Sequence, residues 1–188
     1  MSEAGPLIEL REALAAYANR LHVPTERIDV DRIAVTSAGV HALSLIDQAL
    51  IEPDDRVVIV TPVWPNLTAM PRIMSAEVVP VSLTCHNGVW SLDLQRLLDA
   101  ATPTTRIVLV NSPNNPTGRT MPQHDWDHLL AHCRRHGIWL VSDDAYERIV
   151  FEKPISAYQL TQQKLAEMAL EINRATLLAL HVGRMKDA

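Results

Sequence analysis

Short runs of β-branched residues alternate with longer amphipathic runs, and this alternation constrains the fold of the chain more than any other feature of its sequence. The clearest run, residues 56–61, reads Arg-Val-Val-Ile-Val-Thr and has the pattern of a strand buried on both faces. Similar runs occur at residues 76–81, 106–111 and 138–143. Pro80 disfavours a central position for the second run, because proline cannot donate a ladder hydrogen bond. The sequence therefore predicts a three-layer α/β/α fold with a mostly parallel sheet.

The segments between these runs have the features of helices with recognisable ends. Residues 40–51 place apolar side chains on one stripe at helical spacing. Ser91 is expected to cap a helix over residues 92–101. Pro122 is expected to open a further helix that Gly137 closes.

The last part of the chain has a different pattern. Residues 160–186 contain neither proline nor a strand-like run, and apolar residues recur on one face. This predicts one long helix of roughly 40 Å, which needs a partner because a single apolar stripe cannot cover itself. We therefore expect two parts: an α/β domain over residues 1–150 and a long amphipathic helix within residues 151–188.

Composition argues against several classes of partner. The formal net charge is −5 and the sequence pI is about 5.9, which gives no electrostatic case for a nucleic acid or an anionic membrane. No apolar run approaches the roughly 18–20 residues that span a bilayer. The first ten residues carry no basic leader followed by an apolar stretch. Cys85 and Cys133 lack metal-ligand spacing and are expected to stay reduced, so the sequence predicts a cytoplasmic protein.

Four short motifs occur at predicted strand ends or helix starts, where ligands of open α/β sheets bind. The first, residues 36–42, reads Thr-Ser-Ala-Gly-Val-His-Ala and directly precedes a predicted helix. Free main-chain amides at a helix N-terminus bind anions, and Gly39 allows a phosphate to approach the backbone. The alternative is a tight turn with no ligand.

The second motif, residues 61–66, reads Thr-Pro-Val-Trp-Pro-Asn and follows the most apolar strand. Two prolines restrict the loop, so the indole of Trp64 offers a rigid face on which a planar ring can stack. The alternative is a tryptophan that packs under its own loop.

The third and fourth motifs also follow apolar strands. Residues 111–118 read Asn-Ser-Pro-Asn-Asn-Pro-Thr-Gly, in which Asn115 can donate its amide to a ligand, although a plain turn is the alternative. Residues 141–146 read Val-Ser-Asp-Asp-Ala-Tyr. Asp143 ends a predicted buried strand and is costly to bury without a cationic partner, unless it caps the next helix.

In this order, the four motifs resemble those of the class I/II aminotransferases of fold type I, and the resemblance covers about residues 6–151. It implies the large domain of such an enzyme, with an incomplete sheet, and pyridoxal 5′-phosphate as cofactor. Main-chain amides around Ala38, Gly39 and Val40 would then hold the cofactor phosphate, and Trp64 would stack on the pyridine ring.

The resemblance also implies roles for the later motifs. Asn115 and Tyr146 would hydrogen-bond the phenolic oxygen of the ring, and Asp143 would pair with the ring nitrogen and keep it protonated. The implied reaction transfers an amino group between an amino acid and a 2-oxo acid, with the cofactor as electron sink. Family members are homodimers, so a homodimer is possible here too.

The sequence departs from the family pattern at the Schiff-base lysine. The only lysines after the fourth motif are Lys153, Lys164 and Lys186, and none has the expected Ser-rich context. The substrate-binding arginine and the small domain are missing as well. We assign no catalytic residue and expect the isolated chain to be inactive, with weak, non-covalent cofactor binding at most.

A second resemblance covers the remaining residues. Residues 151–187 resemble the C-terminal helical domain of acyl-CoA dehydrogenases of the glutaryl-CoA type, which predicts a junction near residue 150 between two truncated, fused genes. Val150 stands where that family has glutamine, so flavin binding is not expected. Two alternatives remain open: a non-catalytic module that binds a cofactor or a partner helix, and a fusion product without selected function.

Four histidines recur every four residues along one predicted helix: His124, His128, His132 and His136. Neighbouring pairs have the spacing of metal ligands. Four residues advance by about 400° around a helix, however, so the stripe drifts and cannot converge on one ion. The sequence therefore predicts a solvated helix face and no metal site.

Overall fold

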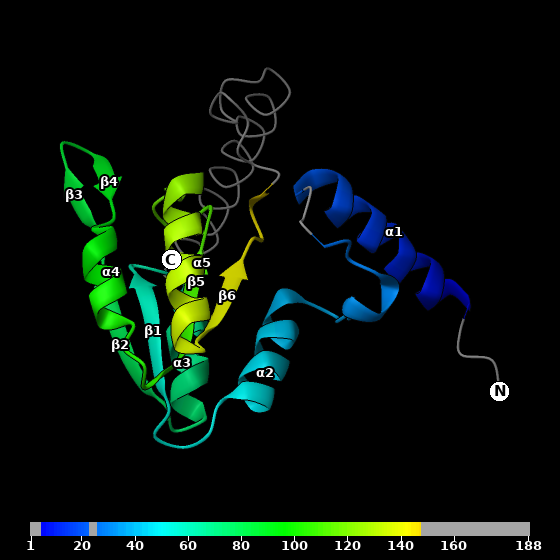
Figure 1. The fold of residues 1–188 in the computed structure, drawn as a ribbon, viewed down its shortest axis with the longest axis horizontal. Helices are drawn as coiled ribbons and strands as arrows, with labels where there is room; N and C mark the ends of the chain where they lie inside the picture. The colour runs from blue at the N-terminus through cyan, green and yellow to red at the C-terminus, as the bar shows by residue number, and fades with distance from the viewer. Residues whose placement is uncertain (1–4, 23–25, 148–188) are drawn as a thin grey trace, which may run out of the picture.

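The computed structural model describes residues 5–22 and 26–147 (Figure 1). The long helix predicted over residues 160–186 and the predicted boundary near residue 150 lie outside the described residues, and so do all three lysines. Among the described helices, none has both the length and the apolar character needed to cross a membrane.

A sheet of four parallel strands forms the centre of the fold. The strands are β1 (Arg56–Thr61), β2 (Glu77–Ser82), β5 (Thr105–Asn111) and β6 (Trp139–Asp143), in the order β2-β1-β5-β6. Each pair of neighbours runs parallel. This confirms the predicted parallel sheet, and the four predicted strand positions agree with the observed strands to within one residue.

Pro80 lies in β2, which is an edge strand of this four-stranded sheet. It is paired in register with Ile59 of β1. The edge position is the one expected, because a strand with a single neighbour in the sheet tolerates a residue that lacks an N–H group.

Helices cover both faces of the sheet, which confirms the three-layer prediction. The helices α2 (Gly39–Leu50) and α3 (Asn66–Ile73) pack on one face, and α4 (Leu94–Ala100) and α5 (Gln123–His136) pack on the other. Successive residues of β1 point to opposite faces. On the α2/α3 face the buried contacts join Val57, Ile59, Leu43 and Leu67. On the α4/α5 face they join Val58, Val60, Leu97 and Leu129.

The two predicted helix boundaries at proline and glycine are confirmed at α5. Pro122 is its N-cap, and Gly137 ends it in the left-handed conformation with φ 68°. The predicted cap at Ser91 is wrong. A hairpin of β3 (Thr84–His86) and β4 (Val89–Ser91) continues through Ser91, and α4 begins only after Asp93, whose carboxylate accepts a hydrogen bond from the Arg96 N–H at 3.0 Å.

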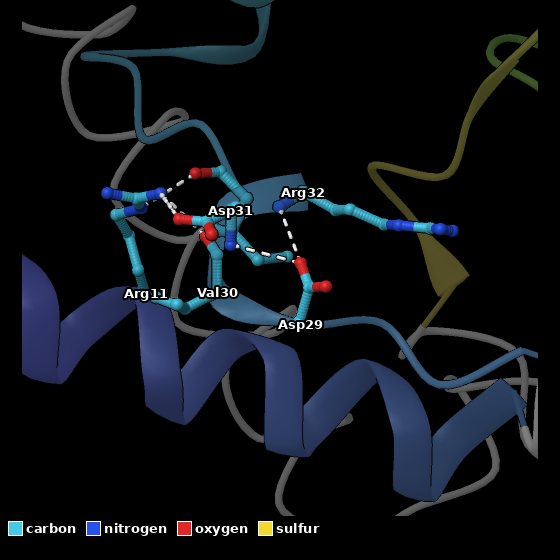
Figure 2. Close-up of polar contacts among 6 residues, drawn as sticks. Arg11, Asp29, Val30, Asp31 and Arg32 are labelled. Atoms are coloured by element: carbon cyan, nitrogen blue, oxygen red, sulfur yellow. Dashed lines mark hydrogen bonds and ion pairs between the residues drawn. The ribbon is translucent and has the colours of Figure 1, made fainter.

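Two N-terminal elements were not predicted from the sequence: the helix α1 (Gly5–His22) and the short 3-10 helix η1 (Val30–Arg32). Figure 1 shows α1 to one side of the sheet, beyond β6. Figure 2 shows how Arg11 joins the two elements, since its guanidinium donates to the Val30 carbonyl at 2.7 Å and lies 3.6 Å from the Asp31 carboxylate. Asp29 caps η1 through the Asp31 and Arg32 amides.

The N-terminal elements thereby fix the segment that leads into the loop before α2. Arg11 also donates to the carbonyl of Ile33, at 2.9 Å. At the far end of α1, the hydroxyl of Tyr17 donates to Glu147 at 2.9 Å, and the ring of His22 lies 3.2 Å from the same carboxylate. Glu147 directly follows the fourth motif. Helix α1 therefore contacts the chain just before the first motif and just after the fourth.

Candidate functional site

A cavity of about 350 Å³ lies where the N-terminus of α2 meets the carboxyl ends of β5 and β6. This volume falls in the range of roughly 300–1,000 Å³ that is typical of small-molecule sites. All seven residues predicted to contact a ligand line it: Ala38, Gly39, Val40, Trp64, Asn115, Asp143 and Tyr146. They come from four separate segments, so the fold brings the four motifs together.

The first turn of α2 offers unused main-chain donors to the cavity. Its N-cap is Ala38, which has an extended conformation and provides no side-chain cap. The amides of Gly39 and Val40 are the first two of the helix and have no carbonyl within the helix to bond. A side-chain carbon at Gly39 would meet nothing within 4 Å, so the backbone there is open to a ligand. These features make an anion site at the positive end of the helix dipole.

The loop before this turn is held by its own side chains. The hydroxyl of Thr36 donates to the carbonyl of Ala38 at 2.9 Å, and the hydroxyl of Ser37 lies 3.1 Å from the Nδ1 of His41. Both hydroxyls are therefore used in shaping the loop and do not cap the free amides of α2.

Trp64 lies between β1 and α3 and has two distinct surroundings. It is half-buried and packs against the core on the α2/α3 face of the sheet, as Val63 and Val141 also do. Its carbonyl accepts a hydrogen bond from the Leu67 amide at 3.0 Å. The residue is thus fixed by the core on one side while it lines the cavity on the other.

Asn115 and Tyr146 meet at the cavity wall. The side-chain amide of Asn115 donates to the hydroxyl of Tyr146 at 3.2 Å, although the two residues are 31 positions apart in the chain. Because the phenol accepts this bond, its own O–H can still donate to a ligand. The amide of Asn115 keeps a second N–H, so the pair can address one ligand oxygen with two donors.

Asp143 is the last residue of β6, and its side chain is half-buried at the cavity. One carboxylate oxygen accepts a hydrogen bond from the Ala145 amide at 3.2 Å. No lysine or arginine belongs to the cavity lining, and within residues 5–22 and 26–147 no cationic side chain pairs with Asp143. A cationic ligand atom is the natural partner for such a carboxylate.

Three further residues line the cavity, and the sequence assigned a ligand contact to none of them: Leu43, Asn111 and Ala145. Asn111 is the most informative of them, since it is polar and only 4% exposed. A signal for it existed in the sequence, because it ends an apolar strand just as Asp143 does.

The histidines of α5 form no ligand set in the structure. His132 and His136 have ring centroids 4.6 Å apart, and the Nε2 of His132 lies 2.7 Å from the carbonyl of Ala101, which occupies this ring nitrogen in a contact with α4. In the described part of the chain, no three side chains are grouped so that they could hold a metal ion.

Comparison with known proteins places these features in a family context. The family model described as aminotransferase class I and II matches residues 4–180. The aspartate/prephenate aminotransferase of Thermus thermophilus is 36% identical over 148 residues, and the arginine–pyruvate transaminase of Pseudomonas aeruginosa is 30% identical over 127 residues. The solved structure of the T. thermophilus aspartate aminotransferase with maleate superimposes with a TM-score of 0.71 at 35% identity.

These matches cover most of this chain but a minor part of each relative. The two curated relatives align with 77% and 68% of this chain and with 37% and 32% of their own lengths, and the solved structure aligns with 78% of this chain and 37% of its own. The chain therefore spans about a third of the length of the relatives it matches.

The comparisons do not support the second predicted resemblance. The aminotransferase match continues to residue 180, through the segment in which a likeness to acyl-CoA dehydrogenases was predicted. A domain boundary near residue 150 stays a prediction.

Proposed function

The chain belongs to the class I and II aminotransferases, and we propose that its cavity binds pyridoxal 5′-phosphate as the large domain of such an enzyme does. The observation that carries this proposal is that four motifs, spread over 108 positions of sequence between Ala38 and Tyr146, line one cavity of suitable size. The chemistry of the lining fits the cofactor group by group.

The phosphate fits the N-terminus of α2. The amides of Gly39 and Val40 donate to its oxygens, and the open backbone at Gly39 lets the anion approach. No arginine or lysine lines the cavity, so main-chain donors and the helix dipole carry this part of the binding.

The ring fits between Trp64 and the two groups at the strand ends. Trp64 offers its indole as a stacking face. The carboxylate of Asp143 accepts a hydrogen bond from the protonated ring nitrogen, and the side chains of Asn115 and Tyr146 donate hydrogen bonds to the phenolic oxygen. The carboxylate of Asp143 stabilises the protonated ring nitrogen because opposite charges favour each other's ionised forms.

When bound in such a site, the cofactor supplies an electron sink for an amino acid, and the chain's residues supply orientation and charge. Asp143 holds a proton at the ring nitrogen, Tyr146 holds one at the phenolic oxygen, and Trp64 shields one ring face from water. We propose that the reaction in question is amino transfer between an amino acid and a 2-oxo acid. A homodimer and a cytoplasmic location remain predictions.

The described part of the chain contains no lysine that could accept the amino-acid Cα proton. The chain's three lysines, Lys153, Lys164 and Lys186, all lie outside that part. We therefore propose that this 188-residue chain, taken alone, binds the cofactor without covalent attachment and does not complete amino transfer.

An absorbance titration of the purified chain with pyridoxal 5′-phosphate tests the binding. A saturable spectral shift is expected, and Asp143→Ala is expected to weaken the affinity about tenfold or more, since a hydrogen bond to a charged group contributes about 1.5–3 kcal/mol. Asp144→Ala is the matched control. It removes the neighbouring carboxylate, which is exposed and does not line the cavity, and is expected to leave the affinity unchanged.

Borohydride reduction followed by peptide mapping tests the absence of covalent attachment. No lysine peptide is expected to carry the cofactor. A specific adduct at Lys153 or Lys164 would contradict the proposed lack of catalysis, and the absence of any saturable shift would contradict the proposed cofactor site.

A further inference from the structure

Asn111 connects the two strand ends that form one wall of the cavity. It is the last residue of β5 and is paired in register with Asp143, the last residue of β6. Its side-chain amide donates to the main-chain carbonyl of Asp143 at 2.9 Å, and its side-chain oxygen accepts a hydrogen bond from the main-chain amide of Asn115 at 2.7 Å. Asn111 is only 4% exposed, and both bonds are partly buried.

We propose that Asn111 is a positioning residue, which sets the distance between the carboxylate of Asp143 and the side-chain amide of Asn115. The proposal rests on the proposed function, in which these two residues contact two positions of the same ring: the ring nitrogen and the phenolic oxygen. A single rigid amide that bonds the backbone of both residues fixes the spacing of their side chains, and a planar ring needs that spacing to be constant.

A side-chain amide matches this hydrogen-bonding pattern at both ends. The Asp143 carbonyl needs a donor and the Asn115 N–H needs an acceptor, and asparagine provides one of each within a single short side chain. The Asp143 carbonyl also accepts from the Ser112 amide at 3.2 Å, so this strand end is held from two directions. An aspartate at position 111 would have the same shape but would present a carboxylate oxygen to a carbonyl oxygen.

Asn114 provides a matched control in the same loop. It is equally buried, at 6% exposed, and its side-chain oxygen accepts bonds from the amide and the hydroxyl of Thr117 at 3.1 and 2.6 Å. Its amide reaches the Pro62 carbonyl at 3.3 Å. It neither bonds β6 nor lines the cavity, so its replacement tests loop stability without touching the Asp143–Asn115 spacing.

The test uses the full chain with pyridoxal 5′-phosphate labelled with ¹⁵N at the ring nitrogen. The ¹⁵N signal reports the proton that Asp143 stabilises, and the ³¹P signal of the same molecule reports the phosphate at α2. For Asn111→Asp we expect a dissociation constant raised about tenfold, and a ring-nitrogen signal displaced toward that of the free cofactor while the bound ³¹P signal persists. Asn114→Asp is expected to keep the parent ring-nitrogen signal.

Asn111→Ala is a second variant, which removes both bonds without adding charge and is expected to displace the ring-nitrogen signal in the same direction. Parent-like ring-nitrogen signals in both Asn111 variants would overturn the positioning role while leaving the cofactor site intact. A parent chain that shows neither a bound ³¹P nor a bound ¹⁵N signal would instead overturn the proposed function, and the positioning role with it.

Discussion

The middle of the sheet and the carboxyl ends of its strands have opposite chemistry. In the middle, residues 57–60 of β1 and 107–110 of β5 are all apolar and at most 4% exposed. At the carboxyl ends stand Asn111, Asp143 and the uncapped amides of α2, whose hydrogen-bonding capacity the chain uses only in part. The middle can only stabilise the fold, whereas the ends have donors and a carboxylate available for a ligand. Substitutions in the two regions should therefore affect different quantities.

Leu97→Ala should have the largest effect, and on stability alone. Leu97 lies in α4, is 0% exposed, and packs in the core on the α4/α5 face, away from the cavity. Truncating such a leucine leaves a cavity and costs about 2–5 kcal/mol of unfolding free energy. Urea denaturation measures this loss, and the affinity of the molecules that remain folded for pyridoxal 5′-phosphate should be unchanged.

Leu45→Ala is the control for this prediction, because Leu45 is a helical leucine that is 46% exposed. It should cost less than about 1 kcal/mol. If Leu97→Ala weakened cofactor binding as much as it weakened folding, the separation of the two regions would be wrong.

Asp47 is the exception within the apolar layer, and it predicts a pH-dependent stability. It is 4% exposed on α2, beside Met70 and Met74 of the α3 region, and its carboxylate bonds no described residue. Burial raises the pKa of Asp47 from its ordinary value of 3.8 to about 6. The protonated form is favoured in the folded state, so stability from this group is fully present below about pH 4 and is lost as the pH rises through about 6.

Asp47→Asn should remove this dependence. Above pH 7 the variant should be more stable than the parent by at most about 3 kcal/mol, since one pKa unit corresponds to about 1.4 kcal/mol, and near pH 4 the two should be equal. Denaturation at pH 4 and pH 8 measures the difference. Asp99→Asn, which removes a carboxylate from the exposed surface of α4, should match the parent within about 0.5 kcal/mol at both pH values. Equal gains in stability at pH 8 in both variants would contradict the conclusion that burial of Asp47 causes the pH dependence.

Gly39→Pro should cause the smallest change in free energy of these substitutions, and it should change cofactor affinity without changing stability. Proline is favourable at the first position of a helix, and Ala38 before it has the extended conformation, φ −164° and ψ 162°, that a residue before proline adopts. The fold should thus keep its stability while one amide donor to the phosphate is lost. Affinity for the cofactor should fall about five- to tenfold, with an unchanged melting temperature.

Val40→Ala is the control for this change, since it keeps the main-chain amide and alters only the side chain. It should bind the cofactor with nearly the parent affinity. An equal loss in both variants would show that the Val40 side chain, and not the amides of α2, contributes to binding.

The sequence predicted the sheet well because its strands are buried on both faces. Continuous β-branched runs such as residues 56–61 have few other structural solutions, and Pro122 and Gly137 bound α5 through strict backbone preferences. The boundary of α4 was harder to place, because Ser91 and Asp93 are both good N-caps and only the extent of the β3–β4 hairpin decides between them.

The residues predicted to contact a ligand could be recognised from their motifs. The roles of the residues that hold them in place could not. Trp64 and Tyr146 stand in recognisable motifs, and the structure brings them to one cavity. The role of Asn111 depends on the register of β5 against β6, and Arg11 contacts η1 from a helix some 20 residues away in sequence. Neither relationship leaves a periodic or local pattern in the sequence, because both depend on contacts between segments that are distant along the chain.

The measurement that tests the division between the two regions most directly is an amide NMR titration of the ¹⁵N-labelled chain with pyridoxal 5′-phosphate. Saturable shifts are predicted for the amides of Gly39 and Val40, the indole N–H of Trp64 and the side-chain amide of Asn115, with Leu97 unchanged. Shifts that centre on the middle of the sheet, or a titration without saturable shifts at these four groups, would contradict a cofactor site at the carboxyl ends of the strands.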